Sequence, residues 1–559
     1  MKPLRAAVLV GLACLVLAAG LRLIRAPAPP SAHEVLRQVY SPRFAPVPPP
    51  APANEVLARL KNDLAGPSGS ATLRRWLPSQ SGTLWIALLI LFVVGFDFAR
   101  PFSSRNVDLV ALQLLGFLFF DILSFANRVR DPYSLARVWW TFSAIVAVSL
   151  FIAVRAVWHV LRPIAIEWRP ALRGKALPAV ALLMLALNVL AAVLRPPDDA
   201  GYFTNLGAQR LRERALLPYG DPLLTGTPGA AYGPLLYVAH VPFQLLVDPV
   251  RLNPISSARP PLGADSTYYL PSPLATQLCT IAFQLVAVAA LFMAGRRVAG
   301  RDAAWALVAL YCGSAFVLGM GGEEYYIGGM TFTSHIAPPA LTTAAFASLA
   351  YPATAGVLLV AAGGCGFYPA FLFPAWLGYF WTKRDERVRF VAGVVVAAFV
   401  VGTFVLLRSR PAGGRGLVGT ILWDTFGHHS DPAGYGASPF GFWGQRGGWR
   451  AWMMRPLSGG SGLTAPALVL FYSFALSCFF LARRRGQHVL ALLSAAVVIG
   501  ANVVKIHSTG TYVAWFYPFL LLGLTQAAAV SGSSTRASTE ESVKMADSAW
   551  QMKPDLPPS

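Results

Sequence analysis

Apolar residues along this chain form long unbroken runs that are separated by short polar stretches. Residues 176–194 (ALPAVALLMLALNVLAAVL) and 390–407 (FVAGVVVAAFVVGTFVLL) contain no charged side chain. Runs of roughly 18 or more apolar residues predict helices that span a membrane. The strands of a barrel would instead alternate apolar and polar positions, and these runs do not. We therefore predict an all-α polytopic membrane protein.

The runs predict about 12–14 transmembrane helices in total. After a first run at 6–21, the predicted spans are 84–99, 107–126, 137–160, 176–194, 275–295, 303–320, 336–350, 353–366, 368–381, 390–407, 463–482, 488–504 and 511–528. A single long, tilted span between 336 and 381 would serve in place of three short ones. The run at 233–249 contains Pro234 and Pro242, so we expect it to lie along the membrane interface.

Composition divides the chain into five regions. Residues 1–25 are predicted to be a signal anchor that forms the first transmembrane helix, because basic residues flank the apolar run on both sides. A Pro- and Ala-rich external linker, 26–83, follows. Accessory transmembrane helices at 84–174 precede the main helical domain at 175–528. The last region, 529–559, mixes Ser, Glu, Lys and Pro and is predicted to be a disordered cytoplasmic tail.

The formal net charge is +21, yet the basic residues occur in short clusters between the apolar runs. This arrangement follows the positive-inside rule, whereas a nucleic-acid-binding protein would gather them on one soluble face. With a cytosolic N-terminus, the clusters on the cytosolic side are 100–105, 162–175, 296–301, 383–389 and 483–485. The polar stretches outside are 195–274, 321–335, 408–462 and the loop that holds Lys505 and His507. We predict a multi-pass cell-membrane protein whose site faces the extracytoplasmic side.

The polar stretch 195–221 (RPPDDAGYFTNLGAQRLRERALLPYGD) opens with two adjacent carboxylates, Asp198 and Asp199. The apolar and basic positions after them predict an amphipathic helix over 200–216 that lies on the membrane surface. One reading is that either carboxylate caps this helix. The other is that the pair raises the pKa of one carboxyl group, which suits a general base that takes a proton from a hydroxyl.

Candidate metal ligands do not form a closed site in the sequence. The five cysteines lie in or beside apolar runs, which predicts packing and not disulfides or a zinc site. His428, His429 and Asp431 have the chemistry of ligands, but their spacing matches no closed site. We predict no metal and no cofactor, with a divalent cation as the alternative that stays open.

The external stretches resemble the GT-C superfamily of membrane glycosyltransferases, and they are most similar to glycosyltransferase family 87. Asp199 follows a spanning run and stands shortly before Tyr202, as an Asp–Tyr pair does in that family. The turn LLPYGDP and the aromatic-x-Pro-Leu sequence at 232–235 come next. Later similar stretches are GGCGFYPAFLFPAWLGYF, ASPFGFWG and KIHSTGTYVAWFYPFLLLGL. The resemblance covers residues 175–528, which it identifies as a GT-C-like glycosyltransferase domain. It does not cover the helices before residue 175.

The resemblance implies a mannosyltransferase-like enzyme that takes a hexose or pentose from a polyprenyl phosphate by an inverting displacement. Asp199, or its neighbour Asp198, would be the catalytic base. The leaving lipid phosphate needs cations, and the candidates are Lys505, His507, Arg446, Arg450, Arg210 and Arg214. Each of these is equally suited to anchoring lipid headgroups. The candidates for binding the sugar or the acceptor are Tyr202, Glu323, Glu324, His428 and His429.

The expected partners are the polyprenyl-phosphate sugar donor, a lipid or glycan acceptor and the membrane lipids, with no nucleic acid. One rival is a transporter or flippase for a lipid-linked sugar, which would carry ionisable groups or broken helices near the bilayer midplane. Another is a non-catalytic subunit of an envelope-assembly complex. The ionisable residues stand mostly at the ends of the predicted spans, which favours the enzyme.

Overall fold

The computed structural model describes most of the chain between residues 80 and 525. The described residues are 80–126, 132–162, 172, 174–195, 197, 199–221, 224–225, 228–247, 250–251, 269–270, 272–321, 326–327, 329–427, 464–483, 486–505 and 511–525. The predicted signal anchor, nearly all of the predicted linker and the predicted tail lie outside them.

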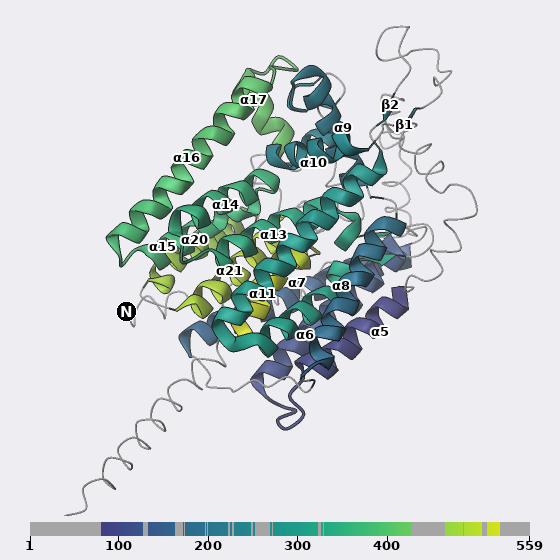
Figure 1. Ribbon diagram of the computed structural model, residues 1–559, viewed down its shortest axis with the longest axis vertical. Coiled ribbons are helices and arrows are strands. Elements are labelled where there is room, and N and C mark those ends of the chain that lie inside the picture. Colours follow the sequence, from purple (N-terminus) through teal and green to yellow (C-terminus); the bar gives the residue numbers. More distant parts are fainter. Residues whose placement is uncertain are drawn as a thin grey trace, which may run out of the picture.

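Helices make up almost all of the described chain (Figure 1). The first are α5 Gln80–Ile90, which continues as the π-helix η1 Leu91–Gly95, then α6 Ser104–Ala126, α7 Pro132–Leu161 and α8 Ala176–Leu194. Next come α9 Asp199–Arg214, η2 Pro228–Ala230, α10 Pro234–Leu246, α11 Pro273–Cys312, α12 Ala315–Leu318, η3 Gly329–Thr331, α13 Thr333–Ala347 and α14 Pro352–Cys365. The last are η4 Tyr368–Leu372, α15 Phe373–Phe380, α16 Arg384–Arg408, α17 Leu417–Leu422, η5 Trp423–Gly427, α20 Thr464–Ala482, α21 Gln487–Val504 and a final helix, Val513–Thr525.

Five described helices are long and apolar enough to cross a membrane, namely α7 (from Trp140), α8, α11, α16 and α21. Shorter apolar helices are found at Gly82–Gly95, Pro234–Leu246, Pro352–Cys365, Ala467–Ala482 and Val513–Thr525. Strands are limited, in the described chain, to two short antiparallel pairs. They are β1 Val250–Arg251 with β2 Tyr269–Leu270 and β3 Met320–Gly321 with β4 Tyr326–Ile327. The all-α prediction is confirmed, and the exact number of crossings stays a prediction.

The helix α11 is a hairpin of two helices that meet at Gly300. This residue has φ 85° and ψ −176°, a conformation that glycine adopts without steric cost. A side chain at Gly295 would come within 2.7 Å of Leu307, so the two halves pack closely. They correspond to two separately predicted spans. In the same way α13, α14 and η4 with α15 are three separate helices, and not the single long one that the charges also allowed.

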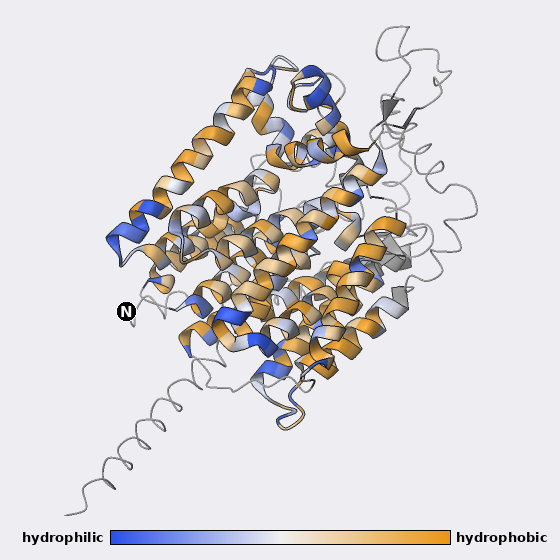
Figure 2. Cartoon of the chain, in the orientation of Figure 1, coloured by the Kyte–Doolittle hydropathy of each residue, from blue (hydrophilic) through white to orange (hydrophobic). Residues whose placement is uncertain are grey.

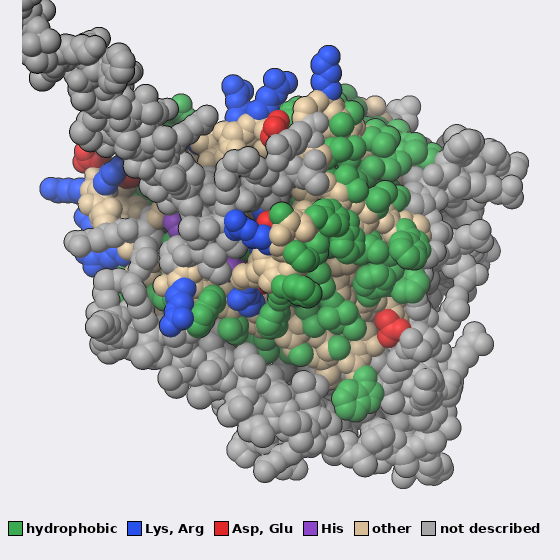
Figure 3. All heavy atoms as spheres, turned by 90° about the horizontal axis from the view of Figure 1, so that it is seen from below, with side chains coloured by type: hydrophobic (Ala, Val, Ile, Leu, Met, Phe, Trp, Pro, Cys, Tyr) green, Lys and Arg blue, Asp and Glu red, His purple; other side chains and the backbone are tan. Residues whose placement is uncertain are grey.

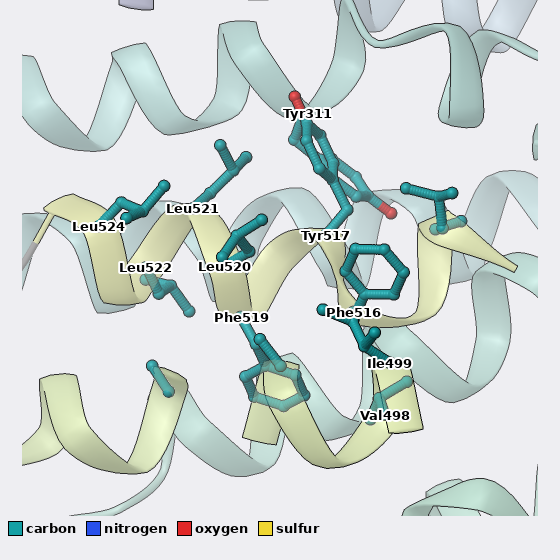
Figure 4. Close-up of a cluster of buried hydrophobic side chains, with 14 of the residues drawn as sticks. Tyr311, Val498, Ile499, Phe516, Tyr517, Phe519, Leu520, Leu521, Leu522 and Leu524 are labelled. Atoms are coloured by element: carbon teal, nitrogen blue, oxygen red, sulfur yellow. The ribbon is translucent and has the colours of Figure 1, made fainter. Parts of the chain in front are cut away.

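One hydrophobic core runs from α5 to the final helix, with buried residues from Leu84 to Leu524. The helix α7 packs against both α6 and α21, so the helices predicted as accessory share this core with the predicted glycosyltransferase domain. Figure 4 shows the part around the final helix. There the rings of Tyr311 and Tyr517 stack with their centroids 6.3 Å apart, and the Tyr517 hydroxyl donates to the Leu310 carbonyl oxygen at 2.9 Å.

Uncharged polar side chains link α8 to α11 inside this core. Asn188 Nδ2 donates to the carbonyl oxygens of Met184 and Cys312, both at 2.7 Å. Gln284 Nε2 in turn donates to Asn188 Oδ1 at 2.8 Å. Interhelical hydrogen bonds of this kind hold helices together where lipid leaves no hydrophobic driving force between them.

Most residues along the helices are hydrophobic, while hydrophilic residues gather at helix ends and around α9 (Figure 2). Figure 3 shows one face with a broad apolar area and with Lys and Arg towards its margins. The helix α16 lies at the periphery, since most of its apolar residues are exposed, whereas those of α21 are mostly buried. Its outward residues, such as Phe399 at 71% exposure, suit contact with lipid.

Candidate functional site

The ends of several helices meet beside the first turn of α9. Arg195, at the end of α8, donates from Nη1 to the Leu318 carbonyl oxygen at 2.7 Å, where α12 ends. Gln277 Nε2 of α11 donates to the Arg195 carbonyl oxygen at 2.9 Å. Thr276 Oγ1, one residue earlier, donates to the Gly201 carbonyl oxygen in α9 at 3.2 Å. The starts of α9 and α11 and the ends of α8 and α12 therefore lie in one layer.

The same layer includes the start of α13 and the end of α21. The hydroxyl oxygens of Thr280 in α11 and Thr333 in α13 are 2.7 Å apart. Trp515 Nε1, from the final helix, donates to a backbone carbonyl oxygen in the first turn of α13 at 3.3 Å. Asn502 Nδ2 of α21 donates to the Tyr512 carbonyl oxygen at 3.1 Å. Parts of three predicted external stretches are thus brought together.

Lys505 directly follows α21 and lies against aromatic rings. Its Nζ is 3.7 Å from the centroid of the Tyr512 ring and 5.4 Å from that of Trp515. His335, in the first turn of α13, lies 4.8 Å from the Tyr512 ring, and Tyr368 stacks on Trp515 at 4.4 Å. A cation over such faces is held by the ring quadrupoles. We call these five residues the Lys505 cluster.

Burial sets the charge state of the Lys505 cluster. Burial lowers the pKa of Lys505 to about 7, because a buried amine is harder to keep charged. Burial, and after it the nearby Lys505 charge, lowers the pKa of His335 to about 3, so this imidazole is neutral at physiological pH. A bound phosphate would favour the protonated form of Lys505, since an opposite charge raises the pKa of an amine. The charge on Lys505 therefore depends on whether an anion lies beside it.

The helix predicted over 200–216 is α9, but its surroundings differ from the prediction. Thr204, Asn205 and Gln209 are buried, so polar side chains face the protein. Gln244 Nε2 of α10 donates to Asn205 Oδ1 at 2.6 Å. A side chain at Gly207 would come within 2.4 Å of the Tyr237 ring, so α10 packs directly on α9. The helix packs between α10 and α11, while Arg212 and Arg214 near its end are exposed. Its position on the membrane surface stays a prediction.

Arg210 forms a buried ion pair with Asp221. Its Nε donates to Asp221 Oδ2 at 2.8 Å and its Nη2 to Oδ1 at 3.1 Å. This bidentate pair occupies the edge of the guanidinium group that would bind a phosphate. The structure therefore gives Arg210 a part in the fold, where it ties the turn at 218–221 to α9. Arg214, near the same end of the helix, is exposed.

The turn at 218–221 is also fixed to α16 and η5. The backbone nitrogen of Arg410 donates to the Tyr219 carbonyl oxygen at 3.1 Å. Gly220 has φ 78°, and a side chain there would lie 1.8 Å from the Arg410 carbonyl oxygen. Its backbone nitrogen donates to Asp424 Oδ2 at 3.0 Å. The LLPYGDP stretch, which helped to carry the resemblance, thus has a structural explanation of its own.

Most of the predicted site residues are not fully described by the structure. Asp199 and Tyr202 are described as backbone positions in α9, without their side chains. The predicted residues outside the described part are Asp198, Glu323, Glu324, His428, His429, Arg446, Arg450 and His507. Lys505, Arg210 and Arg214 are described in full: Lys505 lies against the Tyr512 ring, Arg210 is paired with Asp221, and Arg214 is exposed.

Sequence reasoning did not single out Arg195, Tyr512 or Trp515. Arg195 is 2% exposed although it ends a long apolar helix. A charged residue at the end of an apolar helix could have pointed to a functional position, because a buried cation must find polar partners within the protein. Tyr512 and Trp515 fit an ordinary interfacial belt of aromatic residues in the sequence. Only the fold shows that they lie next to His335 and Lys505.

The described residues contain no group of three or more His, Cys, Asp or Glu side chains that could hold a metal ion. The residues of the open metal alternative, His428, His429 and Asp431, lie outside this part of the chain. Cys279, Cys312, Cys365 and Cys478 are buried free thiols, in agreement with a packing role.

Comparisons with known protein families, with curated proteins and with solved structures give no match.

Proposed function

We propose that this protein is an integral membrane glycosyltransferase that uses a polyprenyl-phosphate sugar as donor. It would act on the extracytoplasmic face and pass the sugar, with mannose as the first candidate, to a lipid or polysaccharide acceptor. The observation that carries the proposal is that Lys505 and the first turn of α9 belong to one layer of helix ends. A lipid-borne phosphate ester has its reacting bond at the level of such a layer. The resemblance of the same loops to family 87 points the same way.

The short segment from the end of η3 to the first turn of α13 supports the proposal, because it neighbours both α9 and the Tyr512 ring. Gly201, just after Asp199 in α9, accepts the hydrogen bond from Thr276, and a side chain there would lie 3.6 Å from the Thr331 carbonyl oxygen. From Thr331 the chain runs directly into α13, where the His335 ring contacts the ring of Tyr512. Lys505 lies on the face of that same Tyr512 ring. The first turn of α9, which contains Asp199, and the Tyr512 ring that contacts Lys505 are thus both next to the segment from Thr331 to His335.

In the proposed reaction Asp199 takes the proton of the acceptor hydroxyl. The acceptor oxygen attacks the anomeric carbon as the bond from that carbon to the phosphate oxygen breaks, and the electron pair leaves with the lipid phosphate. One displacement inverts the anomeric configuration. The charge that grows on the phosphate is met by protonated Lys505, which stabilises the transition state if the cation is already in place.

The sequence separates the roles of the two carboxylates. We assign the role of general base to Asp199, because it follows the spanning run and stands shortly before Tyr202, as in the resemblance to family 87. The alternative role of an Asp at this place is that of a helix cap. Removal of the base should lower the rate by about 10²–10⁴-fold, whereas loss of a cap acts on stability.

The test is the transfer of radiolabelled mannose from a polyprenyl-phosphate donor in membranes that contain Asp199→Asn, Asp198→Asn or the double variant. Asp302→Asn is the matched control, because Asp302 is an exposed carboxylate in the turn of the α11 hairpin. Loss of transfer in Asp199→Asn at normal expression supports the assignment. Full activity in all three variants would remove it.

The rival function is transport of the intact lipid-linked sugar. Purified protein in proteoliposomes distinguishes the two functions, because a flippase moves the donor across the bilayer without cleaving the sugar–phosphate bond. Movement of intact donor with no transfer to any acceptor would replace the glycosyltransferase proposal by the transporter. A protein inactive in both assays would fit a non-catalytic assembly subunit.

A further inference from the structure

The end of α9 and the end of α16 form one surface. The Leu217 backbone nitrogen donates to the Arg408 carbonyl oxygen at 2.7 Å, and Arg408 Nη1 donates to the Ala215 carbonyl oxygen at 3.4 Å. A third hydrogen bond, at 3.1 Å, runs from the Arg410 backbone nitrogen to the Tyr219 carbonyl oxygen. The two segments therefore lie on the same side of the membrane, as the sequence predicts for the polar stretches that contain them.

Exposed arginines crowd this surface, and Figure 2 shows the hydrophilic residues of α9 beside the end of α16. We call them the arginine patch, which consists of Arg212, Arg214, Arg408, Arg410 and Arg415. Glu213 is the one exposed carboxylate of residues 210–221 and 408–427, and its Oε1 lies 3.6 Å from Arg212 Nη2. At this surface the positive charges therefore greatly exceed the negative ones.

The buried carboxylates near the patch do not cancel its charge. Asp221 is paired with Arg210, which is buried as well. Asp424 Oδ2 accepts hydrogen bonds from the Gly220 backbone nitrogen at 3.0 Å and from Thr225 Oγ1 at 2.9 Å. When these groups are included, the two segments contain six arginines against three carboxylates, which is a net charge of +3.

Exposed apolar side chains lie directly beside the arginines. Arg212 Nη1 donates to the Gln244 carbonyl oxygen at 3.4 Å, and Leu246, two residues further along α10, is 77% exposed. Leu407, which precedes Arg408, is 74% exposed. The exposed apolar residues of this surface are Leu245, Leu246, Leu406, Leu407, Val418 and Leu422. Cations at headgroup level with apolar side chains in the acyl boundary are typical of a protein surface that lies in the membrane interface.

The chemistry of the patch matches lipid phosphate. The positive-inside rule concentrates basic residues in cytosolic loops, so five arginines in predicted external stretches need another explanation. The Arg415 guanidinium carbon lies 4.3 Å from the centroid of the Trp423 ring, and tryptophans are enriched at the level of the headgroups. A planar guanidinium group binds a phosphate through two parallel hydrogen bonds. Anionic headgroups therefore complement both the charge and the apolar neighbours of the patch.

We propose that the arginine patch binds the phosphate headgroups of anionic lipids in the adjacent leaflet and thereby holds the end of α9 at the membrane surface. The neighbouring leucines enter the acyl region beside these headgroups. A glycan in the water above the membrane would match the arginines but not the exposed leucines. The inference does not depend on the proposed function, since it uses neither Asp199 nor the Lys505 cluster.

The experiment is photolabelling of the full-length protein in phosphatidylcholine vesicles that contain a minor fraction of a photoreactive lipid. The two probes are phosphatidylglycerol and phosphatidylcholine with the same diazirine close to the headgroup, and mass spectrometry identifies the labelled peptides. In the wild type, phosphatidylglycerol should label residues 206–221 and 406–427 more strongly than phosphatidylcholine does. The double variant Arg410→Gln with Arg415→Gln should lower this ratio roughly fivefold for each arginine removed.

The matched control is the double variant Arg296→Gln with Arg301→Gln, which removes the same charge from exposed arginines beside the turn of the α11 hairpin. It should keep the wild-type ratio at the patch. If the patch variant does not fold, the ratio in the wild type decides alone. Equal labelling of the patch by the two lipids, or a patch variant with the same ratio as the control, would overturn the inference. Loss of the label when soluble polygalacturonate is added would assign the patch to an anionic polysaccharide and would overturn the lipid as its occupant.

Discussion

Lys505 should give sugar transfer a pH dependence that an arginine at the same place would abolish. Burial lowers the pKa of this lysine to about 7, so it loses its proton as the pH rises through neutrality. Above that point the protonated fraction falls about tenfold for each pH unit. A neutral amine does not attract the donor phosphate. The kcat/KM for the donor, which reports the free enzyme, should therefore fall about tenfold between pH 8 and pH 9.

Arginine keeps its charge throughout this range, since its pKa is about 12 or more. The Lys505→Arg variant should therefore show a kcat/KM for the donor that stays level from pH 7 to pH 9, even if its absolute value is lower. His335 does not complicate the profile, because its lowered pKa of about 3 leaves it neutral across the range. The assay is initial-rate transfer from a polyprenyl-phosphate donor in buffered detergent.

The matched control is Lys383→Arg. Lys383 is exposed and pairs with Glu386 at 2.7 Å, near the start of α16 and away from the Lys505 cluster. This variant should keep the profile of the wild type. The reasoning would be refuted if Lys505→Arg lost activity above pH 7 in the same way as the wild type. That result would assign the high-pH loss to another group and leave Lys505 as a packing residue.

Two further predictions concern the turn at 218–221. Asp221→Ala leaves the buried Arg210 charge unpaired and should lower the free energy of unfolding by about 3–5 kcal/mol. In thermal unfolding in detergent, the double variant with Arg210→Leu should recover part of this loss. If the effects of the two substitutions simply added, the pairing would be contradicted. Gly220→Ala should lower the free energy of unfolding by at least about 1–2 kcal/mol because of the left-handed backbone at Gly220, and the nearby Arg410 carbonyl oxygen should add to this loss. The control is Gly402→Ala, where no described atom lies within 4 Å of the new Cβ, and its melting temperature should stay within a degree or so of the wild type. Equal melting temperatures of the two variants would argue against the close contact at Gly220.

The helices themselves could be predicted from the sequence because each depends on local apolar length. The turn at Gly300, and the boundaries between the three short helices after α12, fall where the runs of apolar residues break. The surroundings of α9 could not be predicted in this way. Its polar residues predict contact with water, but Gln244 and Asp221 come from segments that only the fold brings to it.

The candidate site shows the same division. The basic residue Lys505 stands out in the sequence because it ends an apolar run. Its aromatic neighbours Tyr512 and Trp515 follow closely, yet His335 and Tyr368 come from distant segments, and no periodicity links them to it. The depressed pKa of the lysine arises from this burial and therefore cannot be inferred from residue type.

The contact between α7 and α21 constrains how the protein can be made. The ribosome synthesises α7 well before α21, yet α7 finally packs against α21. During synthesis that side of α7 must be shielded by lipid, by the insertion machinery or by a temporary neighbour. The packing of α7 is therefore complete only after α21 has entered the bilayer.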